Sequence, residues 1–332
     1  MHKKSWAVID RPYSLGSATV GALYERPRFF FCAKPQGGEN AQIKGFANRI
    51  LALFVALVSL TLPAFSQTAG AFNASPGLDL TGNWQTIVHE DQPERGPGPE
   101  LVDYAGLPIT DGARQFALSW DAGRLTVPEH QCRVHIVSYI YRGPLNLRIW
   151  EEKDPQSQRL IAIKQYISTY EQWRTIWMDG RPHPPEEAPH TFMGFSTGNW
   201  EGNTLTVYTT HIKQGWIRRN GLPESDKATL TEHYLRHGDF FTHVIIINDP
   251  VYLTQPLIKT QTFRLNVQEG QNWLYPCDPV VEVDRPADSV PNYLPGENPF
   301  LHEFADKHHV PVEAALGGAE TMYPEYQQKI KK

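Results

Sequence analysis

The feature that most constrains the fold is a long succession of short segments rich in Val, Ile, Thr, Tyr and Trp between Leu80 and Val267. Gly, Asn, Asp and Pro separate these segments, as is typical of β-strands joined by turns. We predict strands over 83–89, 115–120, 123–127, 133–142, 145–152, 158–166, 168–178, 203–211, 228–237, 239–248 and 256–266. No segment between them has helical periodicity long enough for a parallel crossover, so the sheet is expected to be antiparallel.

Short connections favour a closed sheet. Gly202-Asn203 lies in a tight turn after Trp200-Glu201, and Gly238-Asp239 separates two strand patterns in the manner of a hairpin turn. With many consecutive strands and short links, an up-and-down barrel removes the exposed sheet edges, and a two-sheet sandwich is the alternative. We therefore expect a mainly β fold, with an antiparallel up-and-down barrel over residues 67–285.

The last part of the chain, residues 286–332, has a different pattern. Three prolines are placed where a helix could begin, in the pairs Asn298-Pro299, Val310-Pro311 and Tyr323-Pro324. Proline is favoured at the first position of a helix, because that position needs no backbone donor. A short C-terminal helical tail of three helices is predicted.

The stretch Ile50–Leu62 is the only long apolar run of the chain, and two basic residues precede it. Its 13 residues are too few to cross a bilayer core, which needs roughly 20. Small residues before Gln67 indicate a signal peptide cleaved near Ser66/Gln67, with cleavage at Ala69/Ala71 as the next choice. Residues 1–66 are thus an N-terminal extension and signal peptide, and we expect a periplasmic or secreted protein. A buried helix and a membrane anchor are the alternatives.

Charge and missing motifs exclude several function classes. The chain has 31 Lys+Arg and 36 Asp+Glu, and residues 1–66 hold 8 of the former and 3 of the latter. The acidic remainder has no basic stripe, which argues against a nucleic-acid partner. No Gly-x-Ser-x-Gly, phosphate-binding glycine loop or dinucleotide fingerprint is present, so serine hydrolases, NTPases and nicotinamide enzymes are disfavoured.

Two cysteines follow the predicted signal peptide, Cys132 and Cys277. In an oxidising compartment they could form a disulfide that ties the early sheet to the end of the barrel. Two unpaired buried thiols are the alternative.

One four-residue motif occurs twice, as Thr81–Trp84 and as Thr197–Trp200, each placed just before a predicted strand. A Gly-x-Trp at the start of a barrel strand resembles the signature of lipocalins and related calycin barrels, in which the Trp closes one end. We expect both Trp side chains to be part of the core and to have no role in chemistry.

Three segments carry a wider resemblance: Ile176–Pro184, Met193–Val207 and Asn248-Asp249-Pro250. They look like a widespread, uncharacterised family of secreted bacterial proteins, over most of residues 78–285. The resemblance implies a calycin-like barrel and an exported product. It implies no reaction, and no catalytic residue is transferred from it.

The clearest geometry comes from the hairpin around Gly238-Asp239. If this pair is a two-residue turn, residues whose numbers sum to 477 face each other, so that Tyr234 lies opposite His243. Side chains alternate, which places Glu232, Tyr234, Arg236 and His243 on one face. A solvated face is one interpretation of this set, and a register slip of one residue would instead favour His233 and His237.

The same face offers acid–base chemistry. We predict that His243 acts as a base and Tyr234 as an acid or hydrogen-bond donor. Glu232 is expected to orient the imidazole, and Arg236 to hold an anionic group of the ligand. The corresponding activity is that of a cofactor-free lyase, hydratase or isomerase.

Aromatic residues before the proline-rich segment 179–190 could contact a small, partly apolar organic molecule inside the barrel. The predicted ligand-binding residues are Tyr170, Trp173, Trp177 and His183. The segment 179–190 is interpreted as a lid or rim over one mouth. Core packing for the aromatic residues is the alternative.

Twelve of the 13 histidines lie beyond residue 66, and three of them could form a metal site. His190, His211 and His243 together would leave an open position on zinc or another divalent metal. Separate, hydrogen-bonded histidines are the alternative, and the main hypothesis needs no cofactor. The competing function classes are therefore a lumen enzyme, a non-catalytic carrier or scavenger of a small molecule, and a His-ligated metalloprotein.

Overall fold

The computed structural model describes residues 79–87, 99–142, 146–267, 276–281, 284–286 and 288–330. All of them lie within one unit of the chain, Thr68–Lys332. The predicted signal peptide and its cleavage site fall outside the described residues. Among the helices of the described ranges, none is long and apolar enough to cross a membrane.

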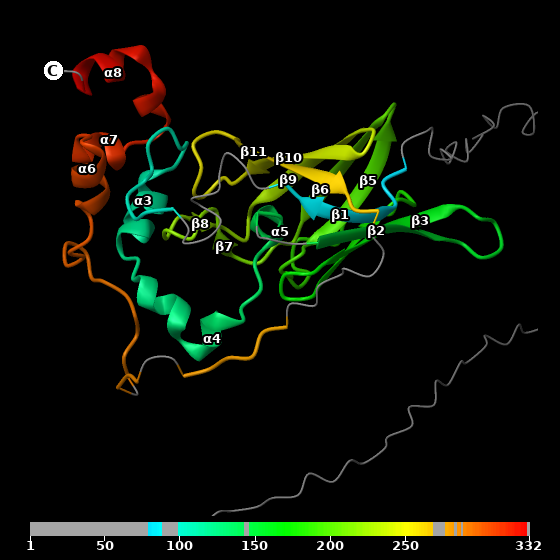
Figure 1. Ribbon diagram of the computed structural model, residues 1–332, viewed down its shortest axis with the longest axis horizontal. Coiled ribbons are helices and arrows are strands. Elements are labelled where there is room, and N and C mark those ends of the chain that lie inside the picture. Colours follow the sequence, from blue (N-terminus) through cyan, green and yellow to red (C-terminus); the bar gives the residue numbers. More distant parts are fainter. Residues whose placement is uncertain are drawn as a thin grey trace, which may run out of the picture. The chain divides into compact units, whose positions relative to one another are not determined.

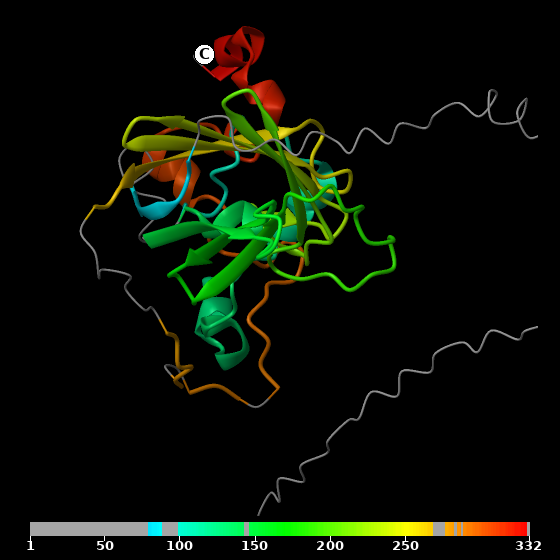
Figure 2. The ribbon, with the colours of Figure 1, turned by 90° about the vertical axis from the view of Figure 1, so that its right-hand side faces the viewer.

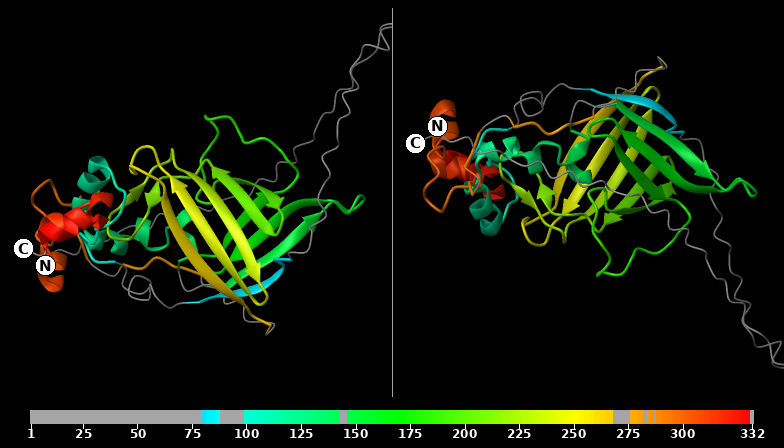
Figure 3. Two further views of the ribbon diagram at one scale, coloured as in Figure 1. Left: turned by 90° about the horizontal axis from the view of Figure 1, so that it is seen from above. Right: turned by 90° about the horizontal axis from the view of Figure 1, so that it is seen from below.

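Nine strands close into a barrel, as the sequence predicts (Figure 1, Figure 3). The order around the barrel is β1-β11-β10-β9-β6-β5-β4-β3-β2. The strands are β1 (Gly82–Thr86), β2 (Asn146–Lys153), β3 (Leu160–Ile167), β4 (Gln172–Trp177), β5 (Phe195–Glu201), β6 (Thr204–Thr210), β9 (Thr229–His237), β10 (Phe240–Asn248) and β11 (Leu257–Leu265). Two short strands outside the barrel, β7 (Gly215–Trp216) and β8 (Pro223–Glu224), pair with each other between β6 and β9.

One neighbouring pair, β4 and β5, is parallel, with Ile176 opposite Ser196. The chain leaves the sheet at the end of β4 and returns beside the same position at the start of β5, and the proline-rich segment is part of this connection. His183 within it contacts Thr197 and Thr210, whose side chains alternate with the buried ones of β5 and β6. The interpretation of this segment as a lid over one mouth is wrong, because it runs along the outside of the sheet.

The register of the β9–β10 hairpin is the predicted one. His243 lies opposite Tyr234 and Ile245 lies opposite Glu232. Burial alternates along both strands, and the buried set of β9 includes Leu230, Glu232 and Tyr234. The face that carries the predicted acid–base residues is thus the barrel interior, and the solvated interpretation is wrong.

Both repeated Trp residues belong to the core, as predicted. Trp84 is fully buried, donates its indole N–H to the Leu80 carbonyl at 2.9 Å and packs edge-on against Phe241. Trp200 is 6% exposed. The first motif overlaps the start of β1 and the second lies inside β5, however, and not before the strands as we expected.

Three predicted strands, 115–120, 123–127 and 133–142, are wrong. These segments form α3 (Asp111–Leu118), η1 (Ala122–Thr126), α4 (Pro128–Gln131) and α5 (Val137–Ile140). The Thr110 side chain accepts a hydrogen bond from the Ala113 N–H and starts α3, and Pro128 occupies the first turn of α4. α5 lies within the outline of the strands when the molecule is turned as in Figure 2.

The C-terminal region is helical, as predicted. It contains α6 (Glu303–His308), α7 (Val312–Ala315), η2 (Ala319–Met322) and α8 (Pro324–Ile330). Arg114 of α3 donates to the Leu316 carbonyl after α7 at 2.6 Å, which joins the tail to the helical side of the unit (Figure 1). α6 begins four residues beyond Pro299, because residues 299–302 form turns.

Cys132 and Cys277 form a disulfide across 145 residues of sequence. The neighbouring Gln131 side chain adds two hydrogen bonds to the backbone of Val280, of 2.6 and 2.7 Å. The segment 276–281 is thereby attached to α4.

Candidate functional site

The barrel interior contains a cluster of buried polar side chains, here called the lumen network. No member is more than 2% exposed. Six strands and the end of α5 contribute its members, which are Tyr141, Gln165, Arg174, Ser196, Thr209, Glu232, Tyr234 and His243.

Arg174 and Glu232 form the centre of the lumen network. The guanidinium makes a two-pronged contact with the Glu232 carboxylate, and one of the two hydrogen bonds measures 2.9 Å. Its remaining donors reach hydroxyl oxygens of Ser196, Thr209, Tyr141 and Tyr234 at 3.0–3.3 Å. Such complete pairing is what allows two charges to remain inside a protein.

Burial by itself raises the pKa of the Glu232 carboxyl, but Arg174 and the hydrogen bond from His243 outweigh it, and the pKa lies well below its usual range. Burial likewise opposes the charge of Arg174, yet Glu232 holds the Arg174 pKa above its ordinary value. Burial lowers the pKa of His243, and Glu232 only partly compensates. At neutral pH the network therefore consists of one cation, one anion and a neutral imidazole.

The tautomer of His243 follows from its partner. Nε2 of His243 lies 2.8 Å from the ionised Glu232 carboxylate, which can only accept, so Nε2 carries the proton. Nδ1 of His243 is then a basic nitrogen with a free lone pair. It is buried and has no hydrogen-bond partner among the described residues. The imidazole is held in place by the Tyr234 ring, stacked at 4.3 Å, and by the Tyr141 ring, edge-on at 4.7 Å.

Three of the four predicted catalytic residues come together. His243, Glu232 and Tyr234 are direct neighbours in the lumen network, whereas Arg236 is not part of it. Arg236 donates to the Gly238 carbonyl at 2.8 Å and lies over the Trp84 ring at the end of the barrel. Its predicted role of holding an anionic group near His243 is wrong, and the cation beside Glu232 is Arg174.

The predicted ligand-binding residues do not share a cavity. Trp173 is 65% exposed on the outside of β4, and Trp177 is stacked against Arg181 on the same outer face. His183 lies outside the barrel against Tyr208, and Tyr170 contacts His135 beyond the end of β3. Alternation along β4 explains the error, because Arg174 and Ile176 take the inward positions.

The predicted metal ligands are divided between two places. The rings of His190 and His211 lie 5.2 Å apart outside the barrel, and each bonds a backbone carbonyl. His243 is in the lumen with Glu232. Within the described part of the chain, no group of three His, Cys, Asp or Glu residues is placed to hold a metal ion.

Sequence reasoning missed Arg174, Gln165, Ser196, Thr209 and Tyr141. The alternation of side chains on β4 could have separated its two faces, because Trp173, Thr175 and Trp177 alternate with Arg174 and Ile176. Hydrophobicity alone assigns the Trp residues to the interior, so the signal pointed to the wrong face. No local signal marks Tyr141, which enters the lumen from the end of a helix of four residues.

Comparison with known proteins adds nothing to this geometry. No family model matches the chain, and no curated protein matches it. The chemistry of the site therefore follows from its own contacts.

A second buried carboxyl, Glu224, lies in β8 against α5. One of its oxygens accepts a 2.7 Å hydrogen bond from Ser138, and the other has no partner among the described residues. Burial raises the Glu224 pKa to about 7, against the opposing effects of Lys259 and Ser138, while Asp249 raises it further. Glu224 is thus a carboxyl that titrates near neutral pH.

Glu224 is expected to make the protein less stable as pH rises. Its folded pKa, about 7, exceeds the reference value of 4.5, so the folded chain binds more protons between these values than the unfolded chain. The free energy of unfolding therefore falls between pH 4.5 and 7, by about 3 kcal/mol. Denaturant unfolding at pH 5 and pH 8 should show a smaller loss for Glu224→Gln than for the wild type. Parallel pH profiles would mean that Glu224 does not titrate.

Proposed function

We propose that this protein is an exported barrel that binds a small, partly apolar organic molecule in its lumen and accepts a proton from it at His243. The observation that carries the proposal is the unpartnered Nδ1 of His243, a buried base whose other nitrogen is fixed by Glu232. Buried polar atoms without a partner are rare in proteins, and a ligand donor would satisfy this one.

The chemistry follows from the charges of the lumen network. A C–H or O–H bond of the ligand breaks, the proton moves to Nδ1, and the resulting imidazolium is stabilised by the Glu232 carboxylate 2.8 Å from Nε2. Glu232 acts as a positioning residue, and Arg174 keeps it ionised. Return of the proton to another carbon of the ligand would complete an isomerase reaction. Breaking of the bond to a hydroxyl group on the neighbouring carbon, with the proton passed to that leaving hydroxyl, would release water and complete a lyase reaction, and a hydratase reaction is its reverse.

Two further observations support the wider proposal. The apolar side chains of Trp84, Phe241 and Phe263, which pack on one another in the barrel interior, would suit a molecule that is partly apolar. The Cys132–Cys277 bond supports export, since disulfides persist in oxidising compartments. The resemblance to secreted calycin-like barrels is in line with both.

Native mass spectrometry of protein exported to a periplasm would test the binding step. We expect an organic mass that is lost on denaturation and a mature chain that begins at Gln67. If the protein carries no bound molecule, the lumen network has only a structural role. A stoichiometric metal would favour the metalloprotein alternative.

The proton transfer can be tested on the released ligand. In D₂O the wild type should exchange one ligand proton for deuterium, and His243→Gln should slow this exchange by at least about 100-fold. Gln retains an N–H donor for Glu232 but has no basic nitrogen. The melting temperature should therefore change little, although the exchange rate falls strongly. A ligand that binds without exchange would identify a carrier.

A further inference from the structure

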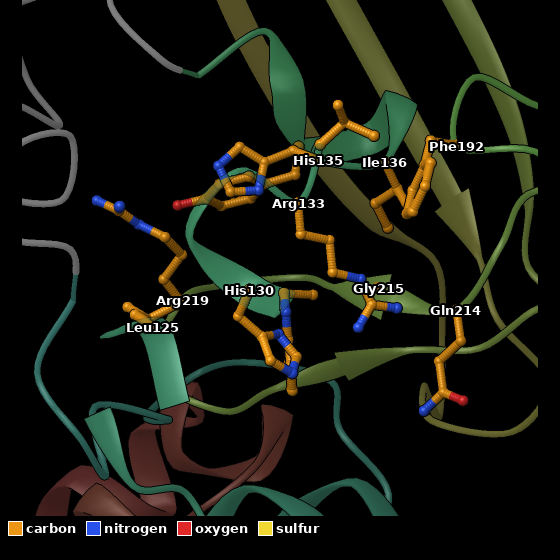
Figure 4. Close-up of a pocket in the computed structure, with 12 residues that line it drawn as sticks. Leu125, His130, Arg133, His135, Ile136, Phe192, Gln214, Gly215 and Arg219 are labelled. Carbon is orange, nitrogen blue, oxygen red and sulfur yellow. The ribbon is translucent and has the colours of Figure 1, made fainter. Parts of the chain in front are cut away.

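A pocket lies between α4, α5 and β7, apart from the lumen network. It is lined by twelve residues, and none of them is acidic. Two arginines, Arg133 and Arg219, lie in this lining together with the aromatic rings of Phe192, Trp216 and Tyr139. Arg219 and Gln214 lie on opposite sides of the pocket, with His130 and Arg133 between them (Figure 4).

The positive charge of the pocket comes from its arginines. Burial lowers the pKa of His135 to about 4, with help from Arg219, and burial followed by Arg133 lowers that of His130. Both imidazoles are therefore mainly neutral at pH 7 and can donate or accept hydrogen bonds. An anion entering the pocket would meet two guanidinium groups and no carboxylate.

Arg133 is the cation most available to a ligand. It is exposed, its guanidinium lies 5.9 Å from the centre of the Phe192 ring, and no carboxylate among the described residues pairs with it. Lys213 approaches the same ring to 4.9 Å. A guanidinium beside an aromatic wall can bind a carboxylate through two parallel hydrogen bonds while the ring packs against the ligand body.

We propose that this pocket binds an aromatic carboxylate, with the carboxylate at Arg133 and the ring against Phe192 and Trp216. The pocket encloses about 30 Å³, so the carboxylate enters it and the ring packs at its open side, where aromatic pairs gain from stacked or edge-on contact. The lining suits a single negative charge, because both of its charged side chains are arginines. This site is independent of the lumen network and stands whether or not the lumen holds a molecule.

Calorimetric titration of the disulfide-bonded protein with benzoate tests the proposal. We expect a Kd below about 1 mM for benzoate and at least about tenfold weaker binding of benzamide, which has the same shape without the charge. Benzoate affinity should also fall as salt is raised. Equal binding of the two compounds, or no saturation by benzoate up to about 10 mM, would overturn the proposal.

Variants locate the site. Arg133→Gln should weaken benzoate binding at least about tenfold, and Arg133→Lys should weaken it less. Arg148→Gln is the matched control, because Arg148 is also an exposed arginine beside an aromatic ring, 5.7 Å from Trp150 on β2. It should leave the benzoate affinity unchanged. Equal loss in the Arg133→Gln and Arg148→Gln variants would indicate a general effect of charge and contradict a site at Arg133.

Discussion

Replacing Glu232 with leucine is expected to lower the free energy of unfolding by about 3–5 kcal/mol. The substitution leaves the Arg174 guanidinium buried at 2% exposure without its carboxylate, and it also removes the partner of His243 Nε2. An unpaired charge in the interior costs far more than the lost attraction, because water can no longer solvate it. Guanidinium unfolding followed by Trp fluorescence measures the loss.

The double variant Arg174→Met/Glu232→Leu separates this cost from the net contribution of the ion pair. Without either charge, Ser196 and Thr209 still share a 2.9 Å hydrogen bond, and Tyr141 still donates to Gln165. The double variant is therefore expected to be more stable than Glu232→Leu alone. If its loss equals the sum of the two single losses, the two charges are not coupled.

The exposed pair Lys227–Glu186 provides the contrasting control. Its N–O distance is 3.0 Å, but the two side chains are 53% and 80% exposed. Water and salt screen such a pair, so Glu186→Gln should leave the unfolding midpoint unchanged. A clear shift of the midpoint in Glu186→Gln would mean that the contribution of an ion pair to the stability of this protein does not depend on its burial.

The β9–β10 hairpin shows how far local rules predict this fold. Gly238-Asp239 defines a two-residue turn, and the period of two then fixes every cross-strand pair without knowledge of the rest of the molecule. Which face points inward does not follow from those rules. Val244 and Ile246 lie on the outward face while Glu232 and His243 are buried, because Arg174 from β4 compensates the charge of Glu232 and Glu232 in turn accepts from His243.

Tertiary contacts also explain the strand that was missed. Gly198 and Asn199 are typical turn residues, yet they lie within β5. A Cβ atom at Gly198 would come within 2.6 Å of the Met178 sulfur and 2.9 Å of the Ile176 side chain, so a larger residue there would force both side chains to shift. This restriction arises only after the connection between β4 and β5 has formed, and no window of sequence contains it.

The helical errors have a different origin. The predicted strands 115–120 and 123–127 contain Phe, Trp, Thr and Val, which favour strands when read alone. The caps that start the helices lie outside these segments, at Thr110 and Asp121, where side-chain oxygens accept from Ala113 and Gly123. Reading the caps before the propensities would have identified α3 and η1.

Removing the Cys132–Cys277 bond is expected to lower the free energy of unfolding by about 2–5 kcal/mol. The bond closes 145 residues of chain, so most of its effect lies in restricting the unfolded ensemble. The double variant Cys132→Ser/Cys277→Ser should unfold at lower denaturant than the oxidised wild type. Its m-value should be larger, since a chain without the cross-link exposes more surface on unfolding.

The folded state should change little in the same variant, because the hydrogen bonds between Gln131 and Val280 still attach segment 276–281 to α4. Gln131→Ala in the oxidised protein is the matched control. It breaks these folded-state contacts while keeping the cross-link, and it should cost about 1 kcal/mol without changing the m-value. If the serine variant and the oxidised protein unfold at the same midpoint, the disulfide does not stabilise the fold by restricting the unfolded chain. If the serine variant instead loses the native near-UV spectrum, the bond maintains the fold directly.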